Sequence, residues 1–256
     1  MTGAWTALVL AAGRPDDALA AAEGVVNKTL IDLNGRPVLQ RVLDALAAAP
    51  NVGRVVVAIE DAGLLAGLYP KPEAARAAGR VVDTVAAGLQ QLGPPLFVVT
   101  GDHGLLTTEM VETFLAGAAA NGAAASVGLA HEATIQAAYP DVRRTYIKFG
   151  DGGYSGCNLF ALRNSDAAKA LGFWQEIDRN RKRPLALIRA VDPWAVALYV
   201  AGRLTLADAM RRLSRKVGVH VDAVTMPIAE AAIDIDKPDD LALARRILAS
   251  RALPPN

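Results

Sequence analysis

Several short segments of this sequence carry side chains that could bind phosphate or a divalent cation. Gly13 and Arg14 follow a buried apolar run, where glycine lets a phosphate approach the backbone and arginine offers a fork of donors. Lys28 adds a mobile positive charge at the far end of the same loop. Asp102 follows another apolar run, at a position where a carboxylate could hold Mg²⁺. These residue types are suited to chemistry on a phosphate group.

Two further carboxylates lie near the end of the chain. Asp234 and Asp236 alternate along an extended stretch, so we expect both to point to one side and Ile235 to the other. Transfer of a nucleotidyl group needs cations over the triphosphate, a metal held by carboxylates, and donors for the charge that grows on the α-phosphate. Each residue alone also has an ordinary explanation, as a solvated lysine or a helix cap. Their shared place after predicted strands favours a common site.

Apolar runs bounded by turns alternate with helical patterns along the first half of the chain. Continuous apolar strands between helices predict an α/β fold, with a mostly parallel sheet covered by helices on both faces. Ligands bind at the carboxyl ends of such strands. The predicted strands span residues 7–11, 55–59, 96–100 and 124–129, and the predicted helices span residues 38–49, 82–92 and 109–121.

The pattern changes in the second half. Residues 146–149 and 157–162 are predicted strands around a glycine-rich turn. Residues 164–218 are predicted to be a helical insertion, followed by a strand over 220–225 and a C-terminal helix. We therefore predict a single domain over residues 1–256.

Composition limits the class of protein. Hydrophobic residues make up 52% and charged residues 21% of the 256 residues, which predicts a globular core. A formal net charge of +1 gives no reason to expect a nucleic-acid partner. The single cysteine, Cys157, fits a reducing compartment, and no apolar run predicts a signal peptide or a membrane span. We expect a cytoplasmic protein.

Three ordered segments give the sequence a family resemblance. "LVLAAGR" followed by "NKTLIDLNGRPVLQRVLDAL", then "VVTGDHGLLT", then "DIDKPDDLALA" resemble the signature segments of nucleotidyltransferases with a GT-A-type, Rossmann-like fold. That group includes molybdenum cofactor guanylyltransferases and the isoprenoid-pathway cytidylyltransferase. The resemblance covers about residues 5–163 and 219–249, and it implies an enzyme that moves NMP from an NTP to an acceptor and releases pyrophosphate.

The resemblance also implies roles for individual residues. Arg14 and the loop backbone before it would hold the β- and γ-phosphates, and Lys28 would stabilise the α-phosphate transition state. Asp102 and Asp236 would hold Mg²⁺ or Mn²⁺, with Asp234 as the alternative ligand. The implied catalytic residues are Arg14, Lys28 and Asp102. The implied nucleotide-binding residues are Leu10, Ala11, Ala12, Gly13, Arg14, Asp83, Thr84, Gly88 and Gly101.

The sequence departs from the family pattern in this loop. Pro15 replaces a glycine, and Asn27 stands where a proline usually precedes the lysine. The loop also carries Asp16, Asp17 and Glu23, which would repel triphosphate unless they turn outward or bind metal.

Two further segments bear on the NTP base and on the acceptor. "VDTVAAGL" resembles the run that reads the base in cytidylyltransferases of this fold, which favours CTP over GTP, UTP and ATP. "YIKFGDGGYSGCNLFALR" is similar to the acceptor-side strands of sugar-phosphate enzymes. A phosphorylated acceptor is expected, with Lys148, Gly156 and Asn158 as its binding residues.

The helical insertion is rich in Lys and Arg and contains Trp174, Trp194 and Tyr199. Three interpretations remain open: a solvated lid, a homodimer interface, and a peripheral contact with the anionic inner face of a membrane. The last would make the acceptor a lipid-linked phosphate or a headgroup precursor.

Two rival functions are a GT-A glycosyltransferase and a non-catalytic nucleotide-binding or membrane-docking module. The first predicts an Asp-x-Asp directly after a mid-chain strand, whereas "DID" lies near the C-terminus. The non-catalytic module would be consistent with the missing loop glycines and with the basic helical insertion.

Overall fold

The computed structural model describes residues 4–180 and 193–252. In these residues eight strands form one sheet, in the order β3-β2-β1-β4-β7-β5-β8, with β6 paired to β7. The strands are β1 (Trp5–Leu10), β2 (Val52–Ile59), β3 (Glu73–Arg76), β4 (Leu96–Thr100), β5 (Ala125–His131), β6 (Ile147–Phe149), β7 (Gly152–Leu162) and β8 (Val221–Met226).

The sheet is mostly parallel, as predicted. β1 pairs in parallel with β2 and β4, β2 with β3, and β5 with β8. Only β7 and the short β6 run antiparallel to their neighbours in the described part. The sequence analysis missed β3, because this edge strand has no apolar run and joins the sheet through its backbone.

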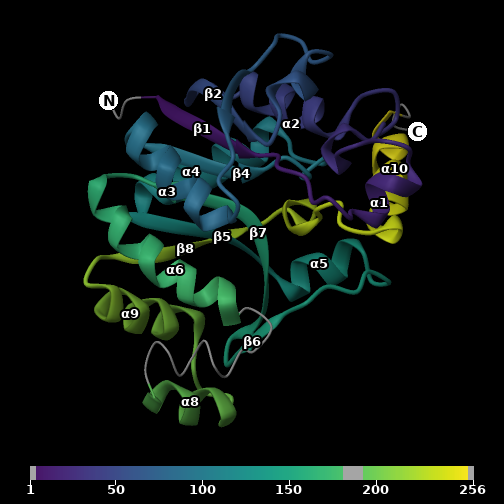
Figure 1. The fold of residues 1–256 in the computed structure, drawn as a ribbon. Coiled ribbons are helices and arrows are strands. Elements are labelled where there is room, and N and C mark those ends of the chain that lie inside the picture. The colour runs from purple at the N-terminus through teal and green to yellow at the C-terminus, as the bar shows by residue number, and fades with distance from the viewer. Residues whose placement is uncertain (1–3, 181–192, 253–256) are drawn as a thin grey trace.

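Helices cover both faces of the sheet (Figure 1). Along β1, Ala7 and Val9 face the layer of α2 and α4, while Leu8 faces the layer of α3 and α6. The helices are α1 (Ala18–Ala22), α2 (Val38–Ala47), α3 (Val81–Leu92), α4 (Thr108–Ala120), α5 (Glu132–Ala138), α6 (Ala168–Asn180), α8 (Pro193–Val200), α9 (Leu206–Val217) and α10 (Pro238–Ala252). The predicted helices in the first half are confirmed, whereas α1 and α5 were not predicted.

The helical block after β7 is not uniform. α6 packs beside α3, and α9 packs against β8, so both help to cover the sheet. α8 lies farther from the sheet (Figure 1) and packs on Phe149 and Leu204. The basic residues at 181–183 and 189 lie outside the described residues, so the lid, dimer and membrane interpretations stay predictions, as does the single-domain assignment. No helix in the described ranges is long and apolar enough to cross a bilayer.

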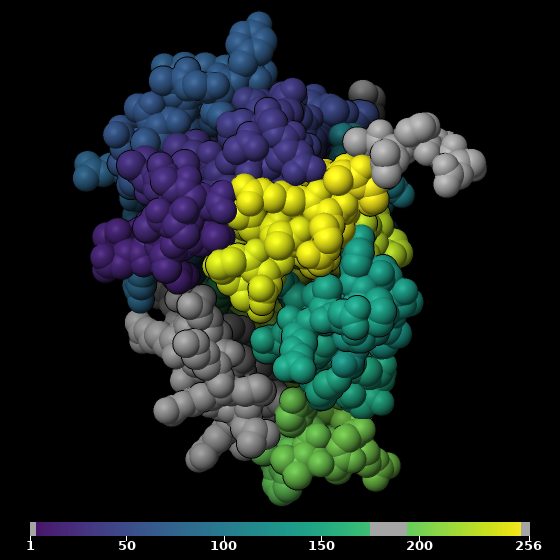
Figure 2. Space-filling model, turned by 90° about the vertical axis from the view of Figure 1, so that its right-hand side faces the viewer, coloured from purple at the N-terminus to yellow at the C-terminus, as the bar shows by residue number. Residues whose placement is uncertain are grey.

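The C-terminal helix holds the N-terminal loop in place. α10 and the segment after β1 lie against each other (Figure 2) and share an apolar cluster that includes Leu19, Ile31 and Leu241. Arg245 pairs with Glu23 at 2.7 Å on the surface of this contact. The C-terminal helix therefore packs against the segment that carries the predicted phosphate loop.

Candidate nucleotide and metal site

A cleft of about 500 Å³ opens at the carboxyl ends of β1 and β4, where the sequence predicts it. We call it the strand-end cleft. The predicted residues that line it are Leu10, Ala12, Gly13, Arg14, Lys28, Thr84, Asp102, Asn158, Asp234 and Asp236. Six other predicted site residues are not among the described residues that line the cleft: Ala11, Asp83, Gly88, Gly101, Lys148 and Gly156.

Lys28 lies between two carboxylates of the strand-end cleft. Its Nζ is 2.6 Å from Oδ2 of Asp102, and it also donates to Oδ1 of Asp236. The side chains of Lys28 and Asp102 are 17% and 14% exposed, whereas that of Asp236 is 61% exposed. Burial lowers the pKa of Lys28, but attraction to Asp102 and then Asp236 outweighs burial and holds this pKa above its usual value. Lys28 is therefore a firmly charged ammonium.

The same pair of carboxylates fits a divalent cation. Both oxygens already converge on one positive charge, and nothing in the described part of the chain hydrogen-bonds to the buried Oδ1 of Asp102. The buried Oγ1 of Thr100, which also lines the cleft, likewise has no partner among the described residues. Over these ranges no preformed group of three or more metal-binding side chains is found. Two carboxylates suit Mg²⁺, which takes its other ligands from water and substrate phosphates.

Asp234 lines the cleft but faces different partners. Arg144 donates to its Oδ1, and the Asn158 side chain donates to its Oδ2 at 2.9 Å. Burial raises the pKa of Asp234, but the charge of Arg144 outweighs burial and holds this pKa below its usual value. Asn158 has a φ of 54°, a conformation uncommon outside glycine and often found at functional sites. Asp234 thus orients Asn158 and Arg144, which leaves Asp236 as the better-placed second ligand.

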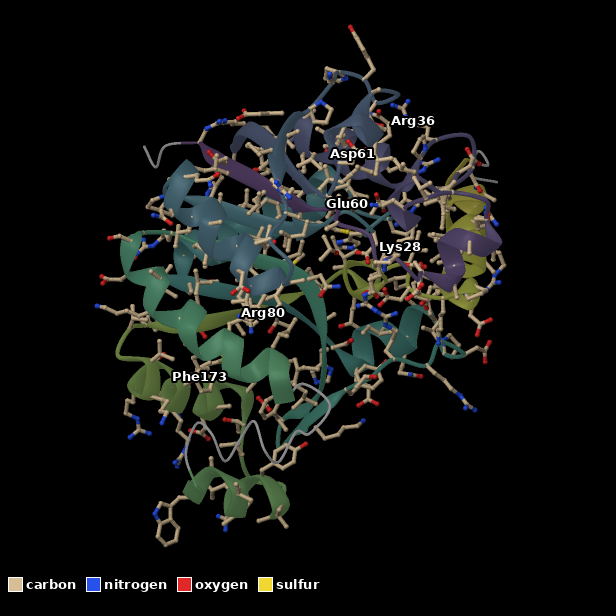
Figure 3. The ribbon with its side chains drawn as sticks, viewed as in Figure 1. Lys28, Arg36, Glu60, Asp61, Arg80 and Phe173 are labelled. Atoms are coloured by element: carbon tan, nitrogen blue, oxygen red, sulfur yellow. The ribbon has the colours of Figure 1, made fainter. Side chains whose placement is uncertain are left out.

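The N-terminal loop is held by a residue that the sequence analysis did not select. Glu60, directly after β2, accepts from the backbone N–H of Gly13 at 2.9 Å (Figure 3). The fully buried Asn27 donates from Nδ2 to the Ala11 carbonyl at 2.8 Å and to Glu60 at 2.9 Å. Gly13 was predicted to present its amide to phosphate, and here that amide is engaged by a carboxylate. The only sequence signal for Glu60 is its position at a strand's carboxyl end.

The three acids of the loop have different surroundings. Asp17 lines the cleft, but its Oδ1 caps α1 by accepting from the N–H groups of Leu19 and Ala20. Glu23 pairs with Arg245, and Asp16 is exposed. Glu23 is therefore paired with a positive charge, whereas Asp17 is held by backbone N–H groups and keeps its negative charge beside the cleft, so the repulsion that the sequence raised is relieved only in part.

The predicted base-reading helix contributes differently from the expectation. The buried Thr84 hydroxyl accepts from the N–H of Ala78 at 2.9 Å and donates to its carbonyl, so it fixes the turn over residues 77–80 that lines the cleft. Asp83 pairs with Arg80 at 2.7 Å. The structure thus gives Thr84 a place at the cleft, whereas Asp83 pairs with Arg80 and does not itself line the cleft.

Gly88 and Gly101 do not line the strand-end cleft, and packing accounts for both glycines. A Cβ on Gly88 would lie 2.5 Å from Cδ2 of Leu8, so this glycine lets α3 pack closely on β1. A Cβ on Gly101 would lie 3.0 Å from Cβ of Ala11, so this glycine brings the turn after β4 against the end of β1. Both glycines serve packing behind the cleft.

Gly88→Ala should therefore destabilise the fold without weakening nucleotide binding. Leu8 is fully buried and its Cδ2 would have to shift within the core to admit the new Cβ, so overpacking should cost about 1–3 kcal/mol, offset in part by up to ~1 kcal/mol of helix propensity. Urea unfolding measures the change. Gly156→Ala, where a Cβ meets nothing within 4 Å, is the control and should be near neutral. Unchanged stability with lost NTP binding would restore the predicted nucleotide contact.

Of the three predicted acceptor residues, the structure brings only Asn158 into the cleft. Lys148 pairs with Glu132 and lies over the Tyr146 ring, with its Nζ 5.1 Å from the ring centroid. Gly156 is exposed on β7. Arg144 was missed because it lies in an irregular loop with no recognisable pattern around it.

Cys157 is a packed residue of β7, within the strand predicted over residues 157–162. It is 2% exposed, and burial raises the pKa of its thiol to about 12. We expect dithiobis(nitrobenzoate) at pH 8 to label the native protein at least tenfold more slowly than the urea-unfolded chain. Because the chain has one cysteine, the label reports this residue alone. Labelling of native protein at the unfolded rate would contradict the buried placement.

The fold and the cleft together define a class: an α/β protein of the Rossmann-like nucleotidyltransferase type. Residues 7–220 match the family described as the MobA-like NTP transferase domain, and the chain belongs to that family. A search of the curated proteins finds no match. The chain is a nucleotidyltransferase.

Solved structures agree with this assignment. The chain is 33% identical to a hypothetical transferase from Thermus thermophilus, with a TM-score of 0.80 over 93% of this chain and 99% of that one. It shares 15% identity and a TM-score of 0.56 with 4-diphosphocytidyl-2C-methyl-D-erythritol synthase from Anaerococcus prevotii, over 97% and 100% of the two chains. The chain is also similar to a CMP:2-keto-3-deoxy-manno-octonic acid synthetase complexed with CTP, with 16% identity and a TM-score of 0.59 over 97% of this chain and 100% of that one. The last two likenesses concern the fold alone.

Proposed function

We propose that this enzyme transfers NMP from an NTP, with CTP favoured, to a phosphorylated acceptor in a metal-dependent reaction. The observation that carries the proposal is the convergence of Lys28, Asp102 and Asp236 in the strand-end cleft. An acceptor phosphate oxygen would attack the α-phosphorus, forming a new P–O bond as the bond to the β-phosphate oxygen breaks and pyrophosphate leaves.

The chain's own residues would act through position and charge. Arg14, which lines the cleft, is suited to hold the outer phosphates through its guanidinium. Lys28, kept protonated by its carboxylate partners, is suited to stabilise the negative charge that grows at the α-phosphate. Asp102 and Asp236 would hold Mg²⁺ or Mn²⁺, and the bound metal would supply charge neutralisation of the triphosphate.

Separate observations support the choice of CTP and the choice of a phosphorylated acceptor. The preference for CTP rests on the resemblance at residues 82–89 and on fold neighbours whose names describe cytidylyl chemistry. The backbone turn over residues 77–80, held by Thr84, offers polar groups at the cleft for a base edge. The acceptor side is supported by Asn158, held by Asp234 at the cleft.

Pyrophosphate release tests the proposal. The purified protein is incubated with Mg²⁺, each of the four NTPs and a panel of sugar, polyol and lipid phosphates. We expect release with at least one pair and the largest thermal stabilisation with CTP, because a ligand that binds only the folded state raises stability by mass action. No release with any pair, together with no stabilisation by any NTP, would overturn the proposal.

A further inference from the structure

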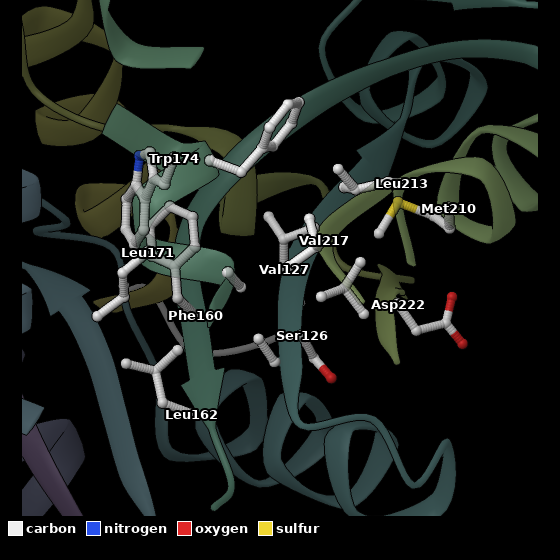
Figure 4. Close-up of a pocket in the computed structure, with 14 residues that line it drawn as sticks. Ser126, Val127, Phe160, Leu162, Leu171, Trp174, Met210, Leu213, Val217 and Asp222 are labelled. Carbon is white, nitrogen blue, oxygen red and sulfur yellow. The ribbon is translucent and has the colours of Figure 1, made fainter. Parts of the chain in front are cut away.

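A second cavity, of about 220 Å³, lies between α6, α9 and strands β5, β7 and β8 (Figure 4). We call it the apolar pocket. Its walls include Val127 on β5, Leu171 on α6, and Leu213 and Val217 on α9. Among the polar side chains of its lining, the Ser126 hydroxyl contacts Asn121, and Oδ1 of Asp222 accepts from the N–H of Ala223. Most of the remaining lining side chains are hydrocarbon, so a group that enters this pocket makes mainly apolar contacts.

The apolar pocket adjoins the strand-end cleft. Phe160 and Trp174 line both cavities, and their rings pack with centroids 4.3 Å apart and planes inclined by 34°. Asn158, the cleft residue on the acceptor side, precedes Phe160 by two residues on β7, a separation of about 7 Å along a strand. The stacked pair is thus the shared wall of the two cavities, and a group that reaches from Asn158 into the apolar pocket has to displace one of these rings.

We propose that the apolar pocket binds an apolar group of the acceptor, while the acceptor's phosphate lies in the strand-end cleft. This inference rests on the proposed function, and it narrows the acceptor to phosphate monoesters that carry a hydrocarbon or aromatic group. Size sets the limit, because an apolar cavity of about 150 Å³ holds a benzene ring. The pocket therefore has room for a ring or a short branched chain, with Phe160 and Trp174 as the wall past which the group enters.

A series of alkyl phosphates tests this inference. Ethyl, butyl, hexyl and octyl phosphate are titrated by calorimetry into the protein with Mg²⁺. Affinity should rise about fourfold for each methylene that enters the pocket, and it should level off once the pocket is full. Thermal stabilisation by CTP and Mg²⁺ is measured on the same samples as an independent test of the nucleotide site.

A variant whose new side chain fills the apolar pocket, compared with the same substitution at an exposed position, tests where the alkyl chain binds. Val217→Phe places a ring in the apolar pocket and should abolish the dependence on chain length, while stabilisation by CTP persists. Val200→Phe is the control: it makes the same change on α8, where Val200 is 72% exposed, and should keep both properties. The titration of the wild type with the alkyl phosphates is itself a test of the pocket, so the inference can be tested even if one of the variants does not fold.

The outcomes separate the two proposals. An affinity independent of chain length in the wild type, with stabilisation by CTP retained, would overturn the apolar pocket and leave the proposed function standing. A graded affinity that Val217→Phe does not change would also overturn it, because the chain would then bind elsewhere. A graded affinity without stabilisation by any NTP and without pyrophosphate release would support the pocket and overturn the proposed function.

Discussion

Lys28→Met should lower kcat about 10²–10³-fold, the effect of removing one donor that stabilises transition-state charge. The side chain keeps a similar length, so the substitution removes the charge and little volume. KM for the NTP should change less than kcat, because the Arg14 guanidinium is proposed to hold the outer phosphates. Steady-state pyrophosphate release measures both constants. Lys169→Met, which removes an exposed ammonium paired with Asp166, is the control and should change neither constant more than twofold.

The same variant has a second readout that does not depend on turnover. Without the Lys28 ammonium, the largely buried Asp102 loses its positive partner, so the protein should be less stable by about 1–3 kcal/mol after discounting for the exposure of Asp236. Mg²⁺ alone should restore more stability to Lys28→Met than it adds to the wild type. Undiminished kcat, or a variant that Mg²⁺ does not stabilise, would contradict the place given to Lys28 and its two carboxylates.

The sheet and the outline of the cleft could be predicted because they depend on local patterns. Continuous apolar runs identify β1, β2 and β4, and the rule for parallel strands places Gly13 and Asp102 at one edge. The partners of Lys28 are different. Asp236 lies 208 residues away; the family resemblance implied that it belongs to the same site as a metal ligand, but its contact with Lys28 was not predicted.

The parts that were missed depend on contacts that no local pattern specifies. Glu60 reaches back to Gly13 across 47 residues, and Arg144 pairs with Asp234 across 90. Gly88 resembles a nucleotide-binding glycine in sequence, yet its role follows from the position of Leu8 on the neighbouring strand. A sequence pattern shows which face of a helix or strand a residue occupies, whereas the residue that it contacts in the folded chain decides what it does.

Asp102→Asn should be the most damaging change to metal use. Both Asp102 and Asp236 face the Lys28 ammonium, but Asp102 is the buried member and has an oxygen with no partner among the described residues. An amide keeps the shape and removes the negative charge, so activity should fall about 10²-fold or more and the Mg²⁺ concentration for half-maximal activity should rise. Titration of activity and of thermal stability with Mg²⁺ measures the two effects separately. Asp166→Asn, on the exposed surface, is the control and should leave both titrations unchanged.

The two remaining aspartates decide how the metal site is completed. Asp236→Asn should raise the Mg²⁺ requirement about tenfold or more, whereas Asp234→Asn should mainly raise KM for the acceptor, because Asp234 holds Asn158 and Arg144. The opposite ranking would make Asp234 the ligand and Asp236 a partner of Lys28 only. In that case Arg144 would have to move off Asp234 when the metal binds, just as the Lys28 ammonium has to move off the oxygens of Asp102 and Asp236 in the assignment made here, since a cationic side chain and a divalent cation on the same carboxylate oxygen repel strongly.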